Sequence, residues 1–142
     1  MMKCLINALA LVAFAQTASA QDPLELYIDA DYSINGAAAA SIELGITTAL
    51  NEADFKLGGL DVTIVPKDHR GNVRRSHDTI KKFIESHTAI AIIGGLHSPP
   101  YMTYQGLINR NNVLLLLPWS AAGPITRAQA GDENWIFRLS VD

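Results

Sequence analysis

Short apolar runs, each ending abruptly in small or polar residues, set the pattern of this chain. Two of them, Ala89–Ile93 and Val113–Leu117, flank a segment with a helical pattern. Apolar runs without alternation are typical of strands buried on both faces, as in a parallel sheet covered by helices. The stretch Thr88–Gly123 therefore predicts a strand–helix–strand unit with a right-handed crossover.

The same alternation of strand and helix patterns extends over most of the chain. Alanines and apolar residues at three- and four-residue spacing predict a helix that starts at Ala37, and Asn72 is a candidate cap for a second helix. Pro66 cannot donate to a sheet, so its strand end is expected at an edge or past the last pairing. The expected strands are 24–29, 61–67, 88–93 and 112–117, the expected helices are 37–53, 73–86 and 98–110, and residues 135–137 approach another strand. This order predicts an α/β fold with a doubly wound, mostly parallel sheet.

The first twenty residues carry a different pattern. Lys3 precedes an apolar core, Leu5–Phe14, and residues 17–20 have the small-x-small pattern of a secretory cleavage site. The core is short for a membrane span. A buried N-terminal helix is the alternative, but the flanks favour a signal peptide over residues 1–20. The single cysteine, Cys4, lies within it, so residues 21–142 have no thiol for a disulfide or a metal site.

Composition and motifs exclude several kinds of function. The 142 residues are 49% hydrophobic and carry a formal net charge of −3, which suits one globular domain or a piece of a larger one. The absence of a basic patch argues against nucleic-acid binding. The four histidines lack metal-ligand spacing, and the sequence has neither a G-x-G-x-x-G nor a P-loop motif. No metal or cofactor is therefore expected.

The candidate functional residues lie where the apolar runs end. Ligands of open α/β sheets bind beyond the carboxyl ends of the strands, and the ends at 94–98 and 118–123 are expected side by side. Ser98, before two prolines, is typical of a helix start, where free amides favour a carboxylate or phosphate. Ser98 either caps this helix alone or also contacts a ligand. Trp119 either stacks on a ligand or covers the core.

A hydrolytic site is the rival interpretation of the same edge. His97 and Ser98 are adjacent, but neighbours in a tight loop rarely point at each other, and there is no G-x-S-x-G elbow. A catalytic role also needs a third group to orient the histidine, and the sequence indicates none. The pattern favours a binding site over an enzyme.

The order of these motifs resembles the N-terminal part of the type I periplasmic solute-binding proteins of ABC transporters. Within that family it is most similar to the leucine/isoleucine/valine-binding, amino-acid-receptor-like branch. The resemblance covers nearly all of residues 24–142. It is carried by Asn51-Glu52-Ala53, Gly58-Gly59, Asp68-His69-Arg70-Gly71-Asn72, Ile92–Ser98, Leu117–Ala122 and Trp135–Ser140.

The resemblance implies both a function and a set of ligand contacts. Two lobes of such proteins close over a ligand, so it implies a periplasmic, non-enzymatic binding component that captures a small polar solute, such as an amino acid, for a membrane permease. Ser98 would hold the ligand carboxylate, and Trp119 would offer its backbone carbonyl to the ligand ammonium. Ala121 stands where amino-acid binders often have threonine, so only its amide remains. The other candidate ligand-binding residues are His97, Ser120, Tyr32 and Ser33.

Family members are much longer than this chain. Residues 21–142 are therefore expected to form a partial N-terminal lobe, with the C-terminal lobe missing and the sequence a fragment. Two alternatives stay open. One is an exported ligand-sensing lobe of a receptor, and the other is an exported α/β hydrolase-type enzyme that uses His97 and Ser98.

Overall fold

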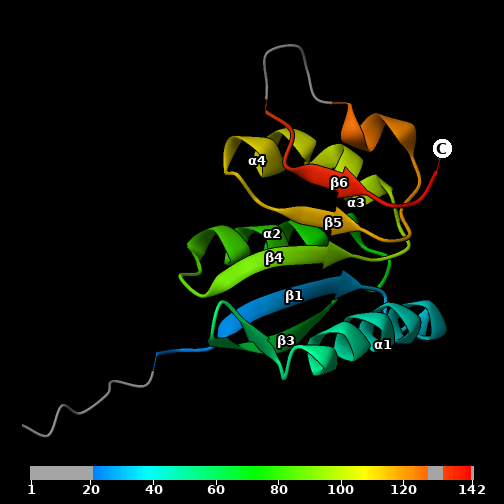
Figure 1. Ribbon diagram of the computed structural model, residues 1–142. Helices are drawn as coiled ribbons and strands as arrows, with labels where there is room; N and C mark the ends of the chain where they lie inside the picture. The colour runs from blue at the N-terminus through cyan, green and yellow to red at the C-terminus, as the bar shows by residue number, and fades with distance from the viewer. Residues whose placement is uncertain (1–20, 128–132, 142) are drawn as a thin grey trace, which may run out of the picture.

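A computed structural model describes residues 21–127 and 133–141, and the expected signal peptide lies outside these residues. Strands and helices alternate along the chain as the sequence predicts (Figure 1). In chain order the elements are β1 (Leu24–Ala30), α1 (Gly36–Glu52), β2 (Lys56–Leu57), β3 (Leu60–Asp68), α2 (Val73–Glu85), β4 (Ala89–Gly94), α3 (Pro99–Thr103), α4 (Gln105–Arg110), β5 (Leu115–Leu117), a 3₁₀ turn η1 (Gly123–Thr126) and β6 (Ile136–Arg138).

The six strands form one sheet in the order β2-β3-β1-β4-β5-β6. All neighbouring strands are parallel except β2 and β3. The chain leaves β1 for β3 on one side and then returns to β4 on the other, so the strand order reverses between β1 and β4. The doubly wound, mostly parallel sheet is therefore confirmed, and its topological switch point lies between these two strands.

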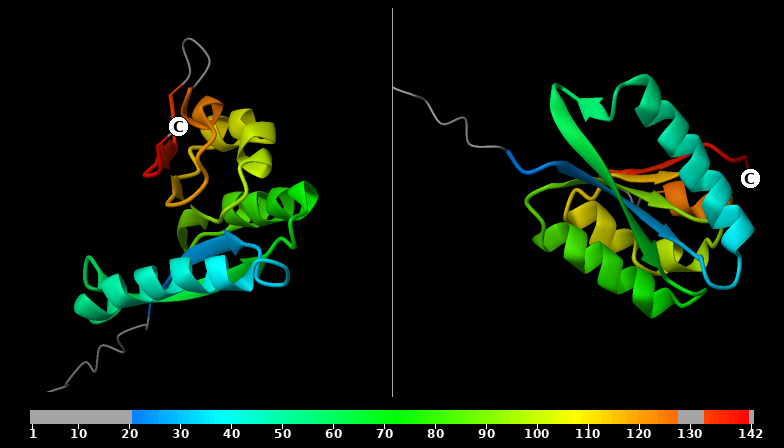
Figure 2. Two further views of the ribbon diagram at one scale, coloured as in Figure 1. Left: turned by 90° about the vertical axis from the view of Figure 1, so that its right-hand side faces the viewer. Right: turned by 90° about the horizontal axis from the view of Figure 1, so that it is seen from below.

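Helices cover both faces of the sheet and give the molecule two apolar cores. Figure 2 shows α1 on one face and α2, α3 and α4 on the other. Successive residues of β1 point to opposite faces, so Leu26 and Ile28 pack with Ile42 of α1, whereas Tyr27 packs with Ile80 of α2. β1 is consequently buried on both faces.

Three local expectations need correction. The single helix expected over 98–110 is broken at Tyr104 into α3 and α4. The strand expected from residue 112 begins only at Leu115. An additional short strand, β2, pairs with the start of β3 through a two-residue turn. Gly58 and Gly59 both have positive φ, 59° and 85°, as tight hairpin turns of this kind require.

Two other expectations hold. The Asn72 side chain accepts a hydrogen bond of 2.9 Å from the backbone N–H of Arg74 and so caps α2. Pro66 pairs with β1, but β2 covers only Leu60 and Asp61 of β3, so the other side of Pro66 is a sheet edge. The missing N–H of proline therefore costs no sheet hydrogen bond.

Candidate functional site

The loops that follow β1, β4 and β5 meet at one edge of the sheet. The buried hydroxyl of Ser120 donates hydrogen bonds to the carbonyls of Gly95, at 2.7 Å, and His97, at 3.1 Å. The backbone N–H of Ala122 donates to the Ser98 hydroxyl at 3.3 Å. The two strand ends that the sequence places side by side are therefore directly bonded. The loop after β1 joins them at the switch point.

Close backbone packing at this edge depends on Gly94 and Gly95. A Cβ atom on Gly95 would lie 2.9 Å from the Cα of Ala30, and one on Gly94 would lie 2.3 Å from a methyl group of Leu117. The N–H of Gly95 also donates to the Asp29 carbonyl, at 2.9 Å. Gly95 therefore lets the chain just after β4 touch β1, and Gly94 leaves room for Leu117 of β5.

Ser98 keeps a proton to donate, but it does not cap a helix. Its backbone is helical, with φ −79° and ψ −33°, and its side chain makes no capping hydrogen bond to α3. The expected capping role is wrong because Pro99 and Pro100 have no N–H groups and the N–H of Tyr101 donates to the Ser98 carbonyl instead. The bond from Ala122 uses an oxygen lone pair of Ser98. Its hydroxyl hydrogen can therefore be offered to a ligand.

His97 contacts a buried acid on the neighbouring loop. Its Nε2 lies 3.2 Å from Asp31 Oδ2 and 3.4 Å from the Asn35 amide nitrogen. Burial alone would raise the pKa of Asp31, but hydrogen bonds from the Ile34 N–H, Asn35 and His97 outweigh it and lower the pKa. His97 thus joins the β4 loop to the β1 loop. Because the hydroxyl of Ser98 contacts Ala122 instead, these contacts are not those of a histidine set between a serine and an acid.

Tyr32 and Ser33 are held by acidic side chains on both flanks. The Tyr32 hydroxyl donates to Glu43 at 2.7 Å, and its N–H donates to Asp68 at 3.0 Å. The exposed Ser33 hydroxyl also donates to Asp68. Burial would raise the pKa of Asp68, but the bonds from Ser33, Arg70 and Tyr32 prevail and lower it to about 2. Asp68 therefore orders the loop that follows β1.

We expect Asp68 to make unfolding acid-sensitive. Its folded pKa of about 2 lies below the ordinary value of 3.8, so its contribution to stability is complete above pH 4 and is lost as the pH falls towards 2. In Asp68→Asn, the melting temperature should fall less steeply between pH 4 and pH 2. Thermal unfolding followed by circular dichroism measures this. Asp54→Asn, at an exposed residue with positive φ that asparagine tolerates, is the control, and equal slopes in Asp68→Asn and the wild type would contradict the prediction.

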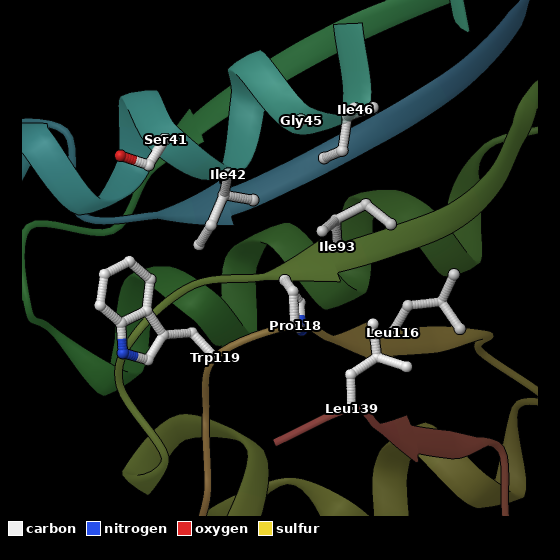
Figure 3. A pocket seen from close by; sticks show the side chains of 9 residues that line it. All are labelled: Ser41, Ile42, Gly45, Ile46, Ile93, Leu116, Pro118, Trp119 and Leu139. Atoms are coloured by element: carbon white, nitrogen blue, oxygen red, sulfur yellow. The ribbon is translucent and has the colours of Figure 1, made fainter. Parts of the chain in front are cut away.

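Trp119 lies on the rim of an apolar groove of about 450 Å³ between α1 and the sheet (Figure 3). Its side chain is 45% exposed, so it is not a core residue of the described chain. Ala121 is exposed too, and its carbonyl accepts a hydrogen bond from Arg138. The groove is lined by Ser41, Ile42, Gly45, Ile46, Ile93, Leu116, Pro118, Trp119 and Leu139.

Sequence reasoning missed the acids at the end of β1. Asp29 and Asp31 are almost fully buried, and Asp31 supplies the partner of His97 that the sequence did not indicate. The signal was available, because two aspartates interrupt the end of an apolar run. The groove left no signal, since its residues are scattered over four segments of the chain.

Within 21–127 and 133–141, no three acidic, histidine or cysteine side chains are grouped so that they could hold a metal ion. No helix in the same ranges has the length and apolar character needed to cross a membrane.

Comparison with solved structures places the fold. The chain matches a leucine-binding protein, LivK, from Thermotoga maritima, with a TM-score of 0.70 and 20% identity over 84% of this chain and 33% of that one. It matches a solute-binding protein of an ABC transporter from R. palustris in complex with benzoate, with a TM-score of 0.72 and 26% identity over 84% and 33%. It also matches an ABC transporter substrate-binding protein from Desulfitobacterium hafniense in complex with Leu. The TM-score is 0.66, and the identity is 18% over 82% of this chain and 34% of that one.

These neighbours are type I periplasmic binding proteins of ABC transporters, and the chain has their fold in incomplete form. They are solute-binding proteins and not enzymes. The chain spans about a third of the length of each solved structure. No protein-family model matches the sequence, and no curated protein matches it significantly.

Proposed function

We propose that this chain is part of the solute-binding component of an ABC transporter and has no catalytic role. It captures a small ligand at the edge formed by the loops after β1, β4 and β5. The observation that carries this proposal is the half-buried Ser98 hydroxyl, which accepts from Ala122 and keeps its own proton for a ligand at this edge. The neighbours that share the fold support the same function.

The ligand that this edge suits carries a carboxylate on a compact apolar body. Ser98 would donate to the carboxylate, and a hydroxyl donor in a partly buried site gives a charge-assisted bond. Trp119 would offer its backbone carbonyl to a polar group and its exposed ring to the apolar body. Leucine and benzoate, bound by two of the structural neighbours, both have these two parts. An amino acid is therefore one of several candidates.

The other candidate residues would have different tasks at this edge. The exposed Ala121 would contribute its backbone amide. His97 and Ser120 would position the loop that carries Ser98, because their side chains already bond to Asp31 and to backbone carbonyls. Tyr32 and Ser33 would form the wall on the β1 side, next to Asp68.

The remaining parts of the proposal concern the longer protein. Residues 1–20 would be a signal peptide that directs export to the periplasm. Residues 21–142 would be a partial N-terminal lobe, and a second lobe would close over the ligand from the other side. A membrane permease would then receive the ligand from the closed protein.

The test is Ser98→Ala in the longest natural form of the protein. Loss of one hydrogen bond to a charged group costs about 1.5–3 kcal/mol, so affinity for the ligand should fall by roughly 10- to 100-fold with little change in melting temperature. Calorimetry with leucine and with benzoate measures it. Thr103→Ala removes a nearby exposed hydroxyl that bonds only within α3 and serves as the control. Unchanged affinity would remove Ser98 from the site, and no binding of either probe by the wild type would overturn the proposed ligand class.

A further inference from the structure

A group of buried polar atoms below the candidate site lacks hydrogen-bond partners. Within the described residues, Asp29 Oδ1, His69 Nε2 and Ser76 Oγ are shielded from solvent and make no hydrogen bond to protein. Nearly all buried polar side-chain atoms in proteins are bonded to protein or to ordered water. Three such atoms in one region therefore call for a common explanation.

The three residues face one another from three segments. Asp29 shares a face of β1 with Tyr27, which packs on the α2 side of the sheet. Ser76, Thr79 and Ile80 are the buried residues of α2, and the Thr79 hydroxyl donates to the carbonyl of Arg75 within the helix. The N–H of His69 donates to the carbonyl of Ala30 at 3.0 Å, which fixes its backbone beside the end of β1. Burial raises the pKa of the Asp29 carboxyl, and the ring of His69 and the hydroxyls of Ser76, Thr79 and Tyr101 oppose this rise, so all four groups lie close to the carboxyl.

His69 brings an unpaired donor to this region. The backbone N–H of Gly71 donates to His69 Nδ1 at 3.0 Å, so Nδ1 is an acceptor and carries no proton. Burial, the largest influence, lowers the pKa of His69, so the ring is neutral near pH 7. A neutral ring without a proton on Nδ1 carries it on Nε2. The unpaired Nε2 is therefore an N–H that points into the protein.

Asp29 brings an unpaired acceptor. Its side chain is 1% exposed, and its Oδ2 accepts a hydrogen bond of 3.2 Å from the Tyr101 hydroxyl. Its Oδ1 has no such partner. A donor, an acceptor and a hydroxyl that can serve as either thus surround one place in the core.

We propose that Asp29, His69 and Ser76 enclose a binding site for a single internal water molecule. The water accepts from His69 Nε2–H, donates to Asp29 Oδ1 and shares its third hydrogen bond with the Ser76 hydroxyl. Three partners is the usual number for a buried water. A cation does not suit the site, because an N–H of neutral histidine has no lone pair to give and would point its hydrogen at the positive charge.

The water has a structural consequence for the ligand edge above it. It joins β1, the β3–α2 loop and the first half of α2. Asp29 is in turn linked through Tyr101 to the N–H of Gly95, at the start of the loop that carries Ser98. The ring of His69 also packs edge-on against His97, with centroids 5.4 Å apart. The site thus supports the candidate edge from below and contributes no ligand contact.

Nuclear magnetic resonance of the full ¹⁵N-labelled chain tests the proposal. We expect His69 to be neutral with its proton on Nε2, and that proton to show a cross-relaxation signal to a long-lived water. In Ser76→Ala the water keeps two partners, so this signal should be lost or weakened and the Nε2 proton should exchange faster with solvent.

The control for this test is a serine-to-alanine change on another helix. Ser41→Ala removes an exposed helical hydroxyl from α1, on the opposite face of the sheet from α2, and should leave the His69 signals unchanged. A His69 proton on Nδ1, or an Nε2 proton bonded directly to Asp29 with no water signal, would overturn the proposal. Should Ser76→Ala not fold, the wild-type spectra alone decide between these outcomes.

Discussion

Gly95→Ala is expected to destabilise the protein by about 3 kcal/mol, towards the upper end of typical overpacking costs. The new methyl group would lie 2.9 Å from the Cα of Ala30 and 3.1 Å from the carbonyl oxygen of Asp29. Both belong to the backbone of the central strand, which cannot turn aside as a side chain can. Urea unfolding followed by circular dichroism measures the change in free energy.

The control for this prediction is another glycine-to-alanine change. Gly45 lies inside α1, and a Cβ there would meet nothing within 4 Å. Gly45→Ala should stabilise the protein by roughly 0.5–1 kcal/mol, because alanine loses less conformational freedom in a helix. If Gly95→Ala proved as stable as the wild type, β4 and β1 would have room between them, and the close approach described here would be wrong.

Tyr101→Phe is expected to cost about 1–3 kcal/mol of unfolding free energy, because it takes a hydrogen-bond partner from the buried Asp29 carboxyl. Its fully buried hydroxyl donates to the Asp29 carbonyl at 2.9 Å and accepts from the N–H of Gly95 at 3.0 Å. Phenylalanine keeps the ring but removes these links and the contact with the Asp29 carboxyl. Urea unfolding again gives the change in free energy.

Tyr104→Phe separates the hydroxyl effect from any general effect of the substitution. Tyr104 is half-buried, and its ring packs on His77 with a centroid distance of 4.7 Å, a contact that phenylalanine preserves. A change within about 0.5 kcal/mol is expected there. Equal losses in the two variants would show that the Tyr101 hydroxyl has no special part in joining β1 to β4.

The layers of the fold could be predicted from the sequence, but several of its local details could not. Continuous apolar runs, as in β4 and β5, are typical of strands that are covered on both faces, so the parallel sheet could be predicted from local pattern. The break at Tyr104 did not, because no glycine or proline marks it. The short strand β2 could not be predicted, because two residues are too few to show an alternation of apolar and polar positions. Only the turn at Gly58-Gly59 left a signal in the sequence.

The sequence predicted where the candidate site lies on the sheet, but it did not predict which side chains contact one another there. Abrupt ends of apolar runs placed Ser98 and Trp119 at the strand edge, because strand ends meet wherever parallel strands pair. The partners of Ser98 and His97 depend on which loops the sheet order brings together. A bond such as that between Asp31 and His97 joins residues 66 positions apart. Local pattern carries no information about such a pair.

The central place of β1 also has a consequence for the time course of folding. The first strand that is synthesised pairs with β3 on one side and β4 on the other, and the bond from Thr88 to Glu25 closes a separation of 63 residues. Contacts between distant residues require a loop to close before they return any stabilisation, and this slows folding. One hydrogen-bonding edge of β1 therefore stays unpaired until the chain through Gly94 has left the ribosome. Over that interval a chaperone has its best access to the segment.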